Sequence, residues 1–206
     1  MKTIIKYELV INEALRSALN YDTPDEQINE FIRFFGKHIG SDRIYIFEDC
    51  DEKHVTKNTY EWCADGIVPE IHELQNVDMD IIGWWYQAFD SEKNIIITDI
   101  EQIKDERRES YNLLKAQNVK NLVVCPIRYK DEIKGFFGVD NPPESDTLGL
   151  TTFLDMIGTL LISLLKLRNS FTKSNKEAML SSYSSLSSIY ISCLLYTSPS
   201  PRDMRR

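Results

Sequence analysis

The sequence is poor in cysteine and histidine, the residues that build disulfide frameworks and most structural metal sites. Its 206 residues include four cysteines and three histidines, and no two cysteines form a Cys-x-x-Cys pair. Cys193 lies in an unusual C-terminal tail, which leaves Cys50, Cys63 and Cys125. An odd set of isolated cysteines is neither a disulfide framework nor a zinc site, and it is typical of a reducing cytoplasm.

Basic residues are also scarce. The chain has 24 lysines and arginines against 32 acidic residues, and its net charge is −8. The last fourteen residues contribute three arginines and one aspartate, so residues 1–192 carry a net charge of −10. Nucleic-acid phosphates are bound by clustered lysines and arginines, so we expect no nucleic acid as a partner.

Long uninterrupted hydrophobic runs are absent as well. Lys6 and Glu8 break the N-terminal segment before the apolar core of an export signal forms. The stretch 148–165 is strongly apolar, but it contains Asp155, Gly158 and four hydroxyl residues, and its apolar positions are periodic. We therefore expect no membrane span and a cytoplasmic location.

Hydrophobic residues make up 42% of the chain and aromatic residues 11%, which is enough for one substantial core. Residues 7–20 repeat apolar side chains at helical spacing, as expected for a helix that rests on such a core. Thr23 and Pro24 suit the cap and first turn of a second helix, which we expect to end near Gly40.

Two hairpins and one isolated strand are predicted to form an antiparallel sheet. In Arg43–Phe47 the residues of both alternating faces are apolar, which predicts a central strand with helices on each side. This arrangement is typical of an α+β fold. We expect strands at 42–48, 55–63, 94–99, 121–129 and 133–139, and intervening helices at 78–89 and 105–117.

Three segments between Ser41 and Pro143 resemble a GAF domain: the strand Asp42–Glu48, the motif Asn58–Cys63 and the last strand Lys134–Pro142. The resemblance is closest to GAF domains that precede cyclic-di-GMP signalling domains in bacterial regulators, and it covers roughly two thirds of the chain. It implies a profilin-like antiparallel sheet of five or six strands with helices on both faces, followed by a long amphipathic helix. The intervening helices would cover a small-molecule pocket.

Aromatic walls with a few polar groups are the usual lining of such a pocket. A cavity of roughly 300 Å³ or more would suit a metabolite. The alternative is that the large aromatic residues fill the core and leave no void. The side chains expected to meet a ligand are Tyr60, Trp62, Trp85, Thr98, Asp99, Tyr111, Cys125 and Phe137.

Departures from better-known GAF subfamilies limit the ligand. The Asn-Lys-Phe-Asp-Glu motif of cyclic-nucleotide-binding members is absent, and no cysteine and histidine context for a bilin is evident. Haem requires an axial ligand, but the three histidines fit surface positions better, so we expect no cofactor and no metal. The four acids Glu61, Glu70, Glu73 and Asp99 are interpreted as surface charge rather than a catalytic pair.

One GAF branch reduces free methionine sulfoxide with a cysteine on a mobile loop. Here the segment 99–121 contains no cysteine, and Cys125 falls within a predicted strand, where a buried thiol is usual. We therefore expect no catalytic activity in this chain.

The trailing helix carries apolar residues at alternating spacings of three and four, an a/d seam of about three heptads. This pattern predicts either a parallel homodimer or packing on the chain's own domain, and extra apolar residues leave room for both. The predicted dimer seam is Leu150, Phe153, Ile157, Leu160, Leu164, Leu167 and Phe171.

The C-terminal end does not read as native sequence. Cys193–Asp203 matches the translation of a transposase adapter used in sequencing libraries. We therefore expect a GAF-like sensor domain at 1–146, a signalling helix at 147–179, the truncated start of a PAS-like domain at 180–192, and a non-native tail at 193–206.

The sequence thus predicts a sensory input domain that binds an unknown small molecule and dimerises. Its parent would be a bacterial cyclic-di-GMP regulator, most simply a GGDEF diguanylate cyclase whose output domain is missing. The alternative is a structural dimerisation module without a ligand.

Overall fold

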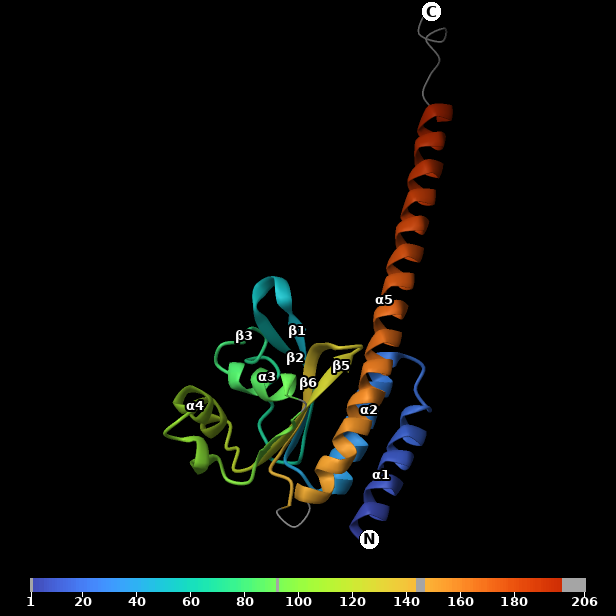
Figure 1. Cartoon of the computed structure of the whole chain (residues 1–206). Coiled ribbons are helices and arrows are strands. Elements are labelled where there is room, and N and C mark those ends of the chain that lie inside the picture. The colour runs from blue at the N-terminus through green and yellow to red at the C-terminus, as the bar shows by residue number, and fades with distance from the viewer. Residues whose placement is uncertain (1, 92, 144–146, 198–206) are drawn as a thin grey trace, which may run out of the picture. The chain divides into compact units, whose positions relative to one another are not determined.

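A six-stranded antiparallel sheet lies at the centre of the domain (Figure 1). The computed structural model describes residues 2–91, 93–143 and 147–197. The strands follow the spatial order β3-β2-β1-β6-β5-β4, which makes β1 and β6 the two central strands. Their bounds are β1 Arg43–Cys50, β2 Val55–Cys63, β3 Val77–Asp78, β4 Ile95–Ile97, β5 Leu122–Tyr129 and β6 Glu132–Asp140.

Helices cover both faces of this sheet, so the predicted α+β, GAF-like architecture is confirmed. One face packs on α1 (Lys2–Ala18), α2 (Pro24–Ile39) and the beginning of α5 (Thr147–Thr197). The other face is covered by α3 (Gly83–Asp90), α4 (Arg108–Ala116) and the short 3-10 helix η2 (Ile100–Ile103). A second 3-10 helix, η1 (Asp51–Lys53), lies in the hairpin between β1 and β2.

Strand β1 divides its side chains between two separate apolar clusters. Ile44 and Ile46 join the cluster beneath α1, α2 and α5, whereas Tyr45 and Phe47 join the cluster beneath α3 and α4. The alternation of apolar residues on both faces therefore predicted a central strand correctly.

Helix α2 begins and ends at the residues expected from the sequence. The Thr23 side chain accepts a hydrogen bond from the Glu26 amide at 3.3 Å, and the Glu26 carboxylate accepts one from the Thr23 amide at 3.2 Å. Gly40 closes the helix in the left-handed conformation at φ 75°. These caps fix the position at which the chain enters β1.

The helix predicted over 78–89 is too long at its start. Val77 and Asp78 instead pair with Thr56 and Val55 as the edge strand β3, and the helix begins only at Gly83. Backbone pairing with the edge of β2 is a long-range interaction that local periodicity does not reveal.

The chain divides into two compact units, Met1–Leu165 and Lys166–Arg206, and α5 contributes residues to both. The boundaries expected at 147, 180 and 193 stay predictions, and residues 198–206 of the expected tail lie outside the described residues. Among the described helices, none is both long and apolar enough to cross a bilayer.

Candidate functional site

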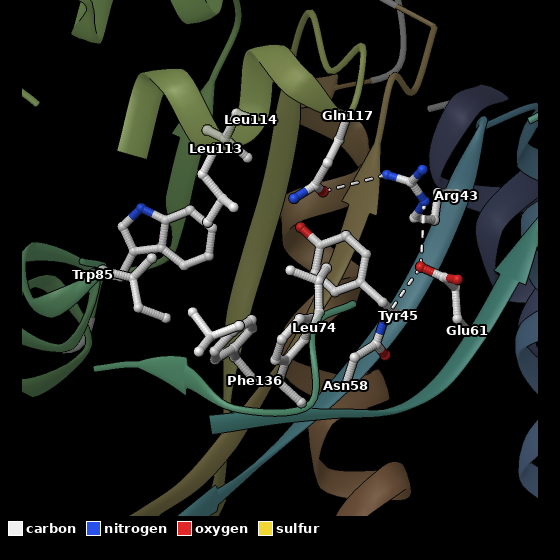
Figure 2. Close-up of a pocket in the computed structure, with 13 residues that line it drawn as sticks. Arg43, Tyr45, Asn58, Glu61, Leu74, Trp85, Leu113, Leu114, Gln117 and Phe136 are labelled. Carbon is white, nitrogen blue, oxygen red and sulfur yellow. Dashed lines mark hydrogen bonds and ion pairs between the residues drawn. The ribbon is translucent and has the colours of Figure 1, made fainter. Parts of the chain in front are cut away.

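A cavity lies between the sheet and the helices α3 and α4 (Figure 2). Its volume is about 40 Å³. Because one water molecule needs about 10–15 Å³ of such space, the cavity has room for a few water molecules but not for a metabolite. It is lined by Arg43, Tyr45, Phe47, Asn58, Glu61, Leu74, Val77, Ile82, Trp85, Leu113, Leu114, Gln117 and Phe136.

Aromatic rings from the sheet and α3 form one wall of the cavity. The Trp85 and Phe136 rings meet edge to face, with centroids 5.5 Å apart and an interplanar angle of 80°. Tyr45 lies across Gly138, where an added methyl group would come within 2.1 Å of the phenol ring. Because Gly138 has no side chain, the Tyr45 ring can lie beside the cavity.

A β-bulge decides which side chains of β2 line the cavity. Phe47 of β1 pairs with Asn58 and Ile46 pairs with Tyr60, so Thr59 is an extra residue on β2. The extra residue changes the alternation between faces. As a result, Asn58 and Glu61 both line the cavity, although strict alternation would put them on opposite faces.

A buried charge network closes the polar end of the cavity. The Arg43 side chain is only 3% exposed, and its Nη1 lies 3.2 Å from Asp140 Oδ2. Its Nε lies 3.4 Å from Glu61 Oε1, an ion-pair distance without hydrogen-bond geometry. Arg43 Nη2 donates to the Val68 carbonyl at 2.8 Å, and Nη1 donates to Gln117 Oε1 at 3.5 Å. These contacts leave the guanidinium closely surrounded by acceptors.

Glu61 is fixed by the backbone as well as by Arg43. Its Oε2 accepts hydrogen bonds from the amides of Glu70 at 2.8 Å and Ile71 at 3.0 Å, and its Oε1 accepts one from Asn58 Nδ2 at 3.2 Å. The Glu61 side chain is 2% exposed. The interpretation of Glu61 as a surface charge is therefore wrong, because the bulge turns it inward.

Burial changes the protonation of this network. It raises the pKa of Asp140 to about 7, although the neighbouring Arg43 and Tyr45 act in the opposite direction. Burial and the Asp140 carboxylate together raise the pKa of Tyr45 well above its ordinary value. Burial also raises the pKa of the Cys63 thiol, as does the Glu61 charge. The thiolate of Cys63 is therefore disfavoured, and Tyr45 stays protonated.

Three polar atoms of the residues that line the cavity have no hydrogen-bond partner among the described residues: Arg43 Nε, which lies at ion-pair distance from Glu61, Asn58 Oδ1 and Trp85 Nε1. Asn58 and Trp85 are 1% and 4% exposed. Native proteins satisfy nearly all buried polar atoms. A water molecule or a ligand would have to supply the missing partners.

Of the eight side chains expected to meet a ligand, Trp85 lines the cavity. Tyr111 belongs to the same apolar cluster, but its hydroxyl donates to Glu101 Oε1 at 2.9 Å. Thr98 and Asp99 are exposed; Asp99 caps η2 by accepting from the Glu101 amide.

The other four expected ligand contacts, Tyr60, Trp62, Cys125 and Phe137, lie on the opposite face of the sheet. Trp62 packs against α2 at Gly36, and the Cys125 thiol donates to the Leu154 carbonyl of α5 at 3.3 Å. These residues are therefore separated from the cavity by the sheet itself.

Arg43, Tyr45, Asn58, Gln117 and Asp140 were not predicted as site residues. One sequence signal was available for Arg43, since this charged residue directly precedes the run Ile44–Phe47, which is apolar on both faces of the strand. No comparable signal marks Asn58, because its orientation depends on the bulge.

The apolar residues of α5 fall into two groups. Leu150, Phe153 and Ile157 are buried in the chain's own core. Leu160 and Leu164 are half-buried, while Leu167 and Phe171 are 52% and 42% exposed. The first three positions of the predicted seam thus pack on their own domain.

One group of side chains has the composition of a metal site. His54, Asp78 and Asp80 place one ligand atom each within 4.8 Å of the others, and all three are exposed. His54 Nε2 lies 3.0 Å from Asp80 Oδ1, and this hydrogen bond raises the pKa of His54. No feature of the surrounding described residues distinguishes the group from an ordinary surface ion pair.

A shallow groove of about 450 Å³ lies beside this group, between the starts of α3 and α4. Arg107 stacks over the Trp84 ring at 5.6 Å, and Trp84 Nε1 donates to Ser110 Oγ at 2.9 Å. Ser110 Oγ in turn donates to the Ile81 carbonyl at 2.7 Å, so Trp84 Nε1 and Ser110 Oγ are already hydrogen-bonded.

The family model described as GAF domain matches residues 23–165. The chain therefore belongs to the GAF domain family, a family of sensory domains. The match confirms the resemblance to a GAF domain that was inferred from Asp42–Glu48, Asn58–Cys63 and Lys134–Pro142.

A regulatory protein is among the relatives of the chain. The methanogenesis regulatory histidine kinase FilI of Methanothrix harundinacea (strain 6Ac) is 24% identical over 127 residues, or 60% of this chain and 14% of the kinase. The chain thus spans a small part of that relative's length.

Solved structures with the same fold include bilin-binding proteins. The far-red absorbing dark state of JSC1_58120g3 with bound biliverdin IXa has a TM-score of 0.63 and 12% identity, covering 78% of this chain and 99% of that one. The phycoerythrobilin-bound GAF domain of a cyanobacterial phytochrome has a TM-score of 0.60 and 16% identity, covering 79% and 97%. At these identities the likeness concerns the fold alone.

Proposed function

We propose that this chain is the sensory input domain of a bacterial signal-transduction protein and that it binds a small molecule in the cavity beneath α3 and α4. The observation that carries this proposal is the pair of buried atoms without partners, Asn58 Oδ1 and Trp85 Nε1. Native proteins satisfy nearly all buried polar atoms, so a partner for these two atoms is expected. Binding would require α4 to move outward, because the cavity holds only about 40 Å³.

A second candidate is a structural dimerisation module without a ligand. The same small cavity volume favours it, since aromatic side chains already fill most of the space between sheet and helices. The two candidates differ in whether occupation of the cavity stabilises the protein.

Thermal unfolding in the presence of the small-molecule fraction of a bacterial lysate distinguishes them. A ligand at about 100 times its Kd stabilises a protein by about 2.7 kcal/mol, or about 5 to 10 °C in Tm for a domain of this size. We expect such a rise for the wild type and for Leu9→Trp, an exposed control on α1. Leu113→Trp fills the cavity and should lose the rise.

The comparison uses the change in Tm on adding the fraction, because Leu113→Trp also alters the starting stability by overpacking. An equal rise for Leu113→Trp would place the ligand elsewhere. No rise for any of the proteins would favour the structural module.

We further propose that the protein forms a parallel homodimer through the exposed part of α5. Leu167 and Phe171 are large apolar side chains four residues apart on a helix and both are substantially exposed. Leu160 and Leu164, which precede them at heptad spacing, are half-buried. In a parallel dimer, these four side chains of one helix would be buried against the same four of the other, as in a coiled coil.

Sedimentation of the full chain at protein concentrations of roughly tens of micromolar tests whether the dimer forms. We expect a coiled-coil pair to be assembled at such concentrations. Leu167→Asp would place two like charges in the seam and should give monomers. Asn169→Asp adds the same charge on the opposite side of the helix and should leave the dimer intact. A monomeric wild type would contradict the proposal.

The parent protein is proposed to be a cytoplasmic cyclic-di-GMP regulator, most simply a GGDEF diguanylate cyclase. The support is the resemblance of the domain and of the segment 180–192, which looks like the opening of a PAS-like module. The relative that is a histidine kinase supports a regulatory output in general. Reading the gene downstream of Ile191 tests this assignment, and a kinase or phosphodiesterase domain there would replace the cyclase.

Residues 193–206 are proposed to be adapter-derived rather than native, on the basis of the match at Cys193–Asp203. Independent reads of the source DNA should show a different in-frame continuation after residue 192. The same tail in several genomes would overturn this proposal.

A further inference from the structure

The charge of the cavity wall limits what the cavity can bind. Among the described residues that line it, Arg43 is the only one with a basic side chain. Arg43 contacts two buried carboxylates, Glu61 and Asp140, each 2% exposed, and it also donates to the Val68 carbonyl. The positive charge of Arg43 is therefore already matched, and the network as a whole carries no spare positive charge.

An anionic ligand would have to compete for this guanidinium. Removing Arg43 from Glu61 would leave a buried carboxylate without its ion-pair partner, which is strongly unfavourable. Glu61 is held in place by the amides of Glu70 and Ile71, so it cannot turn away to make room. The Glu61 carboxylate therefore stays beside the cavity, where it repels a second negative charge.

The remaining features of the wall favour a planar ligand with N–H groups. Asn58 Oδ1 is a buried acceptor without a partner among the described residues, and only a donor can satisfy it. The rings of Tyr45, Trp85 and Phe136 offer edges and faces to a flat group. Aromatic faces also attract cations directly.

We propose that the cavity is selective for compact planar ligands that are neutral or cationic and carry an N–H donor for Asn58, and that it rejects carboxylates and phosphates. This inference rests on the proposed ligand-binding function and names the chemical class of the ligand. It excludes cyclic nucleotides and cyclic dinucleotides as occupants of this cavity, because both carry phosphate.

Three probes of nearly the same shape test the charge rule, by which the cavity accepts neutral and cationic ligands and rejects anionic ones. The probes are benzamidine, benzamide and benzoate. They share a phenyl ring and differ in the charge and donors of one small planar group. NMR of the full chain follows the indole N–H signals, with that of Trp85 identified by its loss in Trp85→Phe. The Trp62 signal serves as an internal control, since Trp62 lies on the opposite face of the sheet.

We expect benzamidine and benzamide to shift the Trp85 signal with saturation at about millimolar concentrations, as is usual for fragments of this size. Benzoate should leave the signal unchanged. Asn58→Ala should weaken benzamide binding by about three- to tenfold, the effect of one lost hydrogen bond. The comparison of the three probes on the wild type does not depend on how well this variant folds.

A shift with benzoate at equal or lower concentration than with benzamidine would overturn the charge rule while leaving the ligand-binding function in place. No shift with any probe would overturn the inference. The response of the wild type and Leu113→Trp to the lysate fraction then decides separately whether the proposed function survives.

Discussion

Replacing Asp140 by asparagine removes the titrating group of the buried network and tests whether the network is as enclosed as its geometry indicates. Asp140 is 1% exposed at the end of β6 and lies 3.2 Å from Arg43 Nη1. Asparagine has nearly the same shape as a protonated aspartate but cannot ionise. The substitution therefore isolates the cost of the buried negative charge.

The sign of the effect follows from the pKa of Asp140, which rises from an ordinary 3.8 to about 7 in the folded protein. Between these values the folded protein holds a proton that the unfolded chain has released. The contribution of Asp140 to the free energy of unfolding is therefore complete below about pH 4 and is lost as the pH rises through about 7. At 1.36 kcal/mol per pH unit, the full difference corresponds to roughly 4 kcal/mol.

Urea unfolding followed by circular dichroism at about pH 5 and about pH 8.5 measures this difference. From about pH 5 to about pH 8.5, the free energy of unfolding of the wild type should fall by about 3 kcal/mol more than that of Asp140→Asn. Most of the Asp140 titration falls in that interval. Asp65→Asn, at an exposed position after β2, controls for the loss of one carboxylate. Parallel pH profiles for the wild type and Asp140→Asn would refute the reasoning.

Three further substitutions test the fold. Thr23→Ala removes the reciprocal cap with Glu26 and should cost about 1 kcal/mol in urea unfolding; no change would mean that water replaces the cap. Gly135→Ala puts a methyl group 1.9 Å from the Phe47 carbonyl at a positive φ of 140° and should cost at least about 2 kcal/mol, measured in the same way. Ile157→Asp should prevent folding as seen by circular dichroism, because Ile157 is fully buried; a folded monomer would instead place Ile157 in a dimer seam.

Local signals in the sequence were enough to predict several elements of this fold. Thr23, Pro24 and Gly40 act through their nearest neighbours, so the bounds of α2 follow from the chain alone. The alternating apolar residues of Arg43–Phe47 likewise required two covered faces, because each face of a strand must be buried against something. The first prediction depends on interactions between near neighbours, and the second on the pattern of side chains within a single strand.

The cavity could not be predicted in the same way. A single extra residue at Thr59 places Asn58 and Glu61 on the cavity side, while Tyr60 and Trp62 face the opposite helices. This bulge exists only in the pairing of β2 with β1, so it has no signature in the spacing of β2 itself.

The role of the trailing helix was also decided by tertiary contacts. Its heptad pattern is continuous from Leu150 to Phe171, and a pattern of that kind suits a domain surface and a second helix equally well. Only packing showed that Leu150, Phe153 and Ile157 belong to the core, while Leu167 and Phe171 stay substantially exposed. The sequence by itself determined that this helix is amphipathic; which partner covers each apolar side chain depends on what the rest of the chain brings within contact distance.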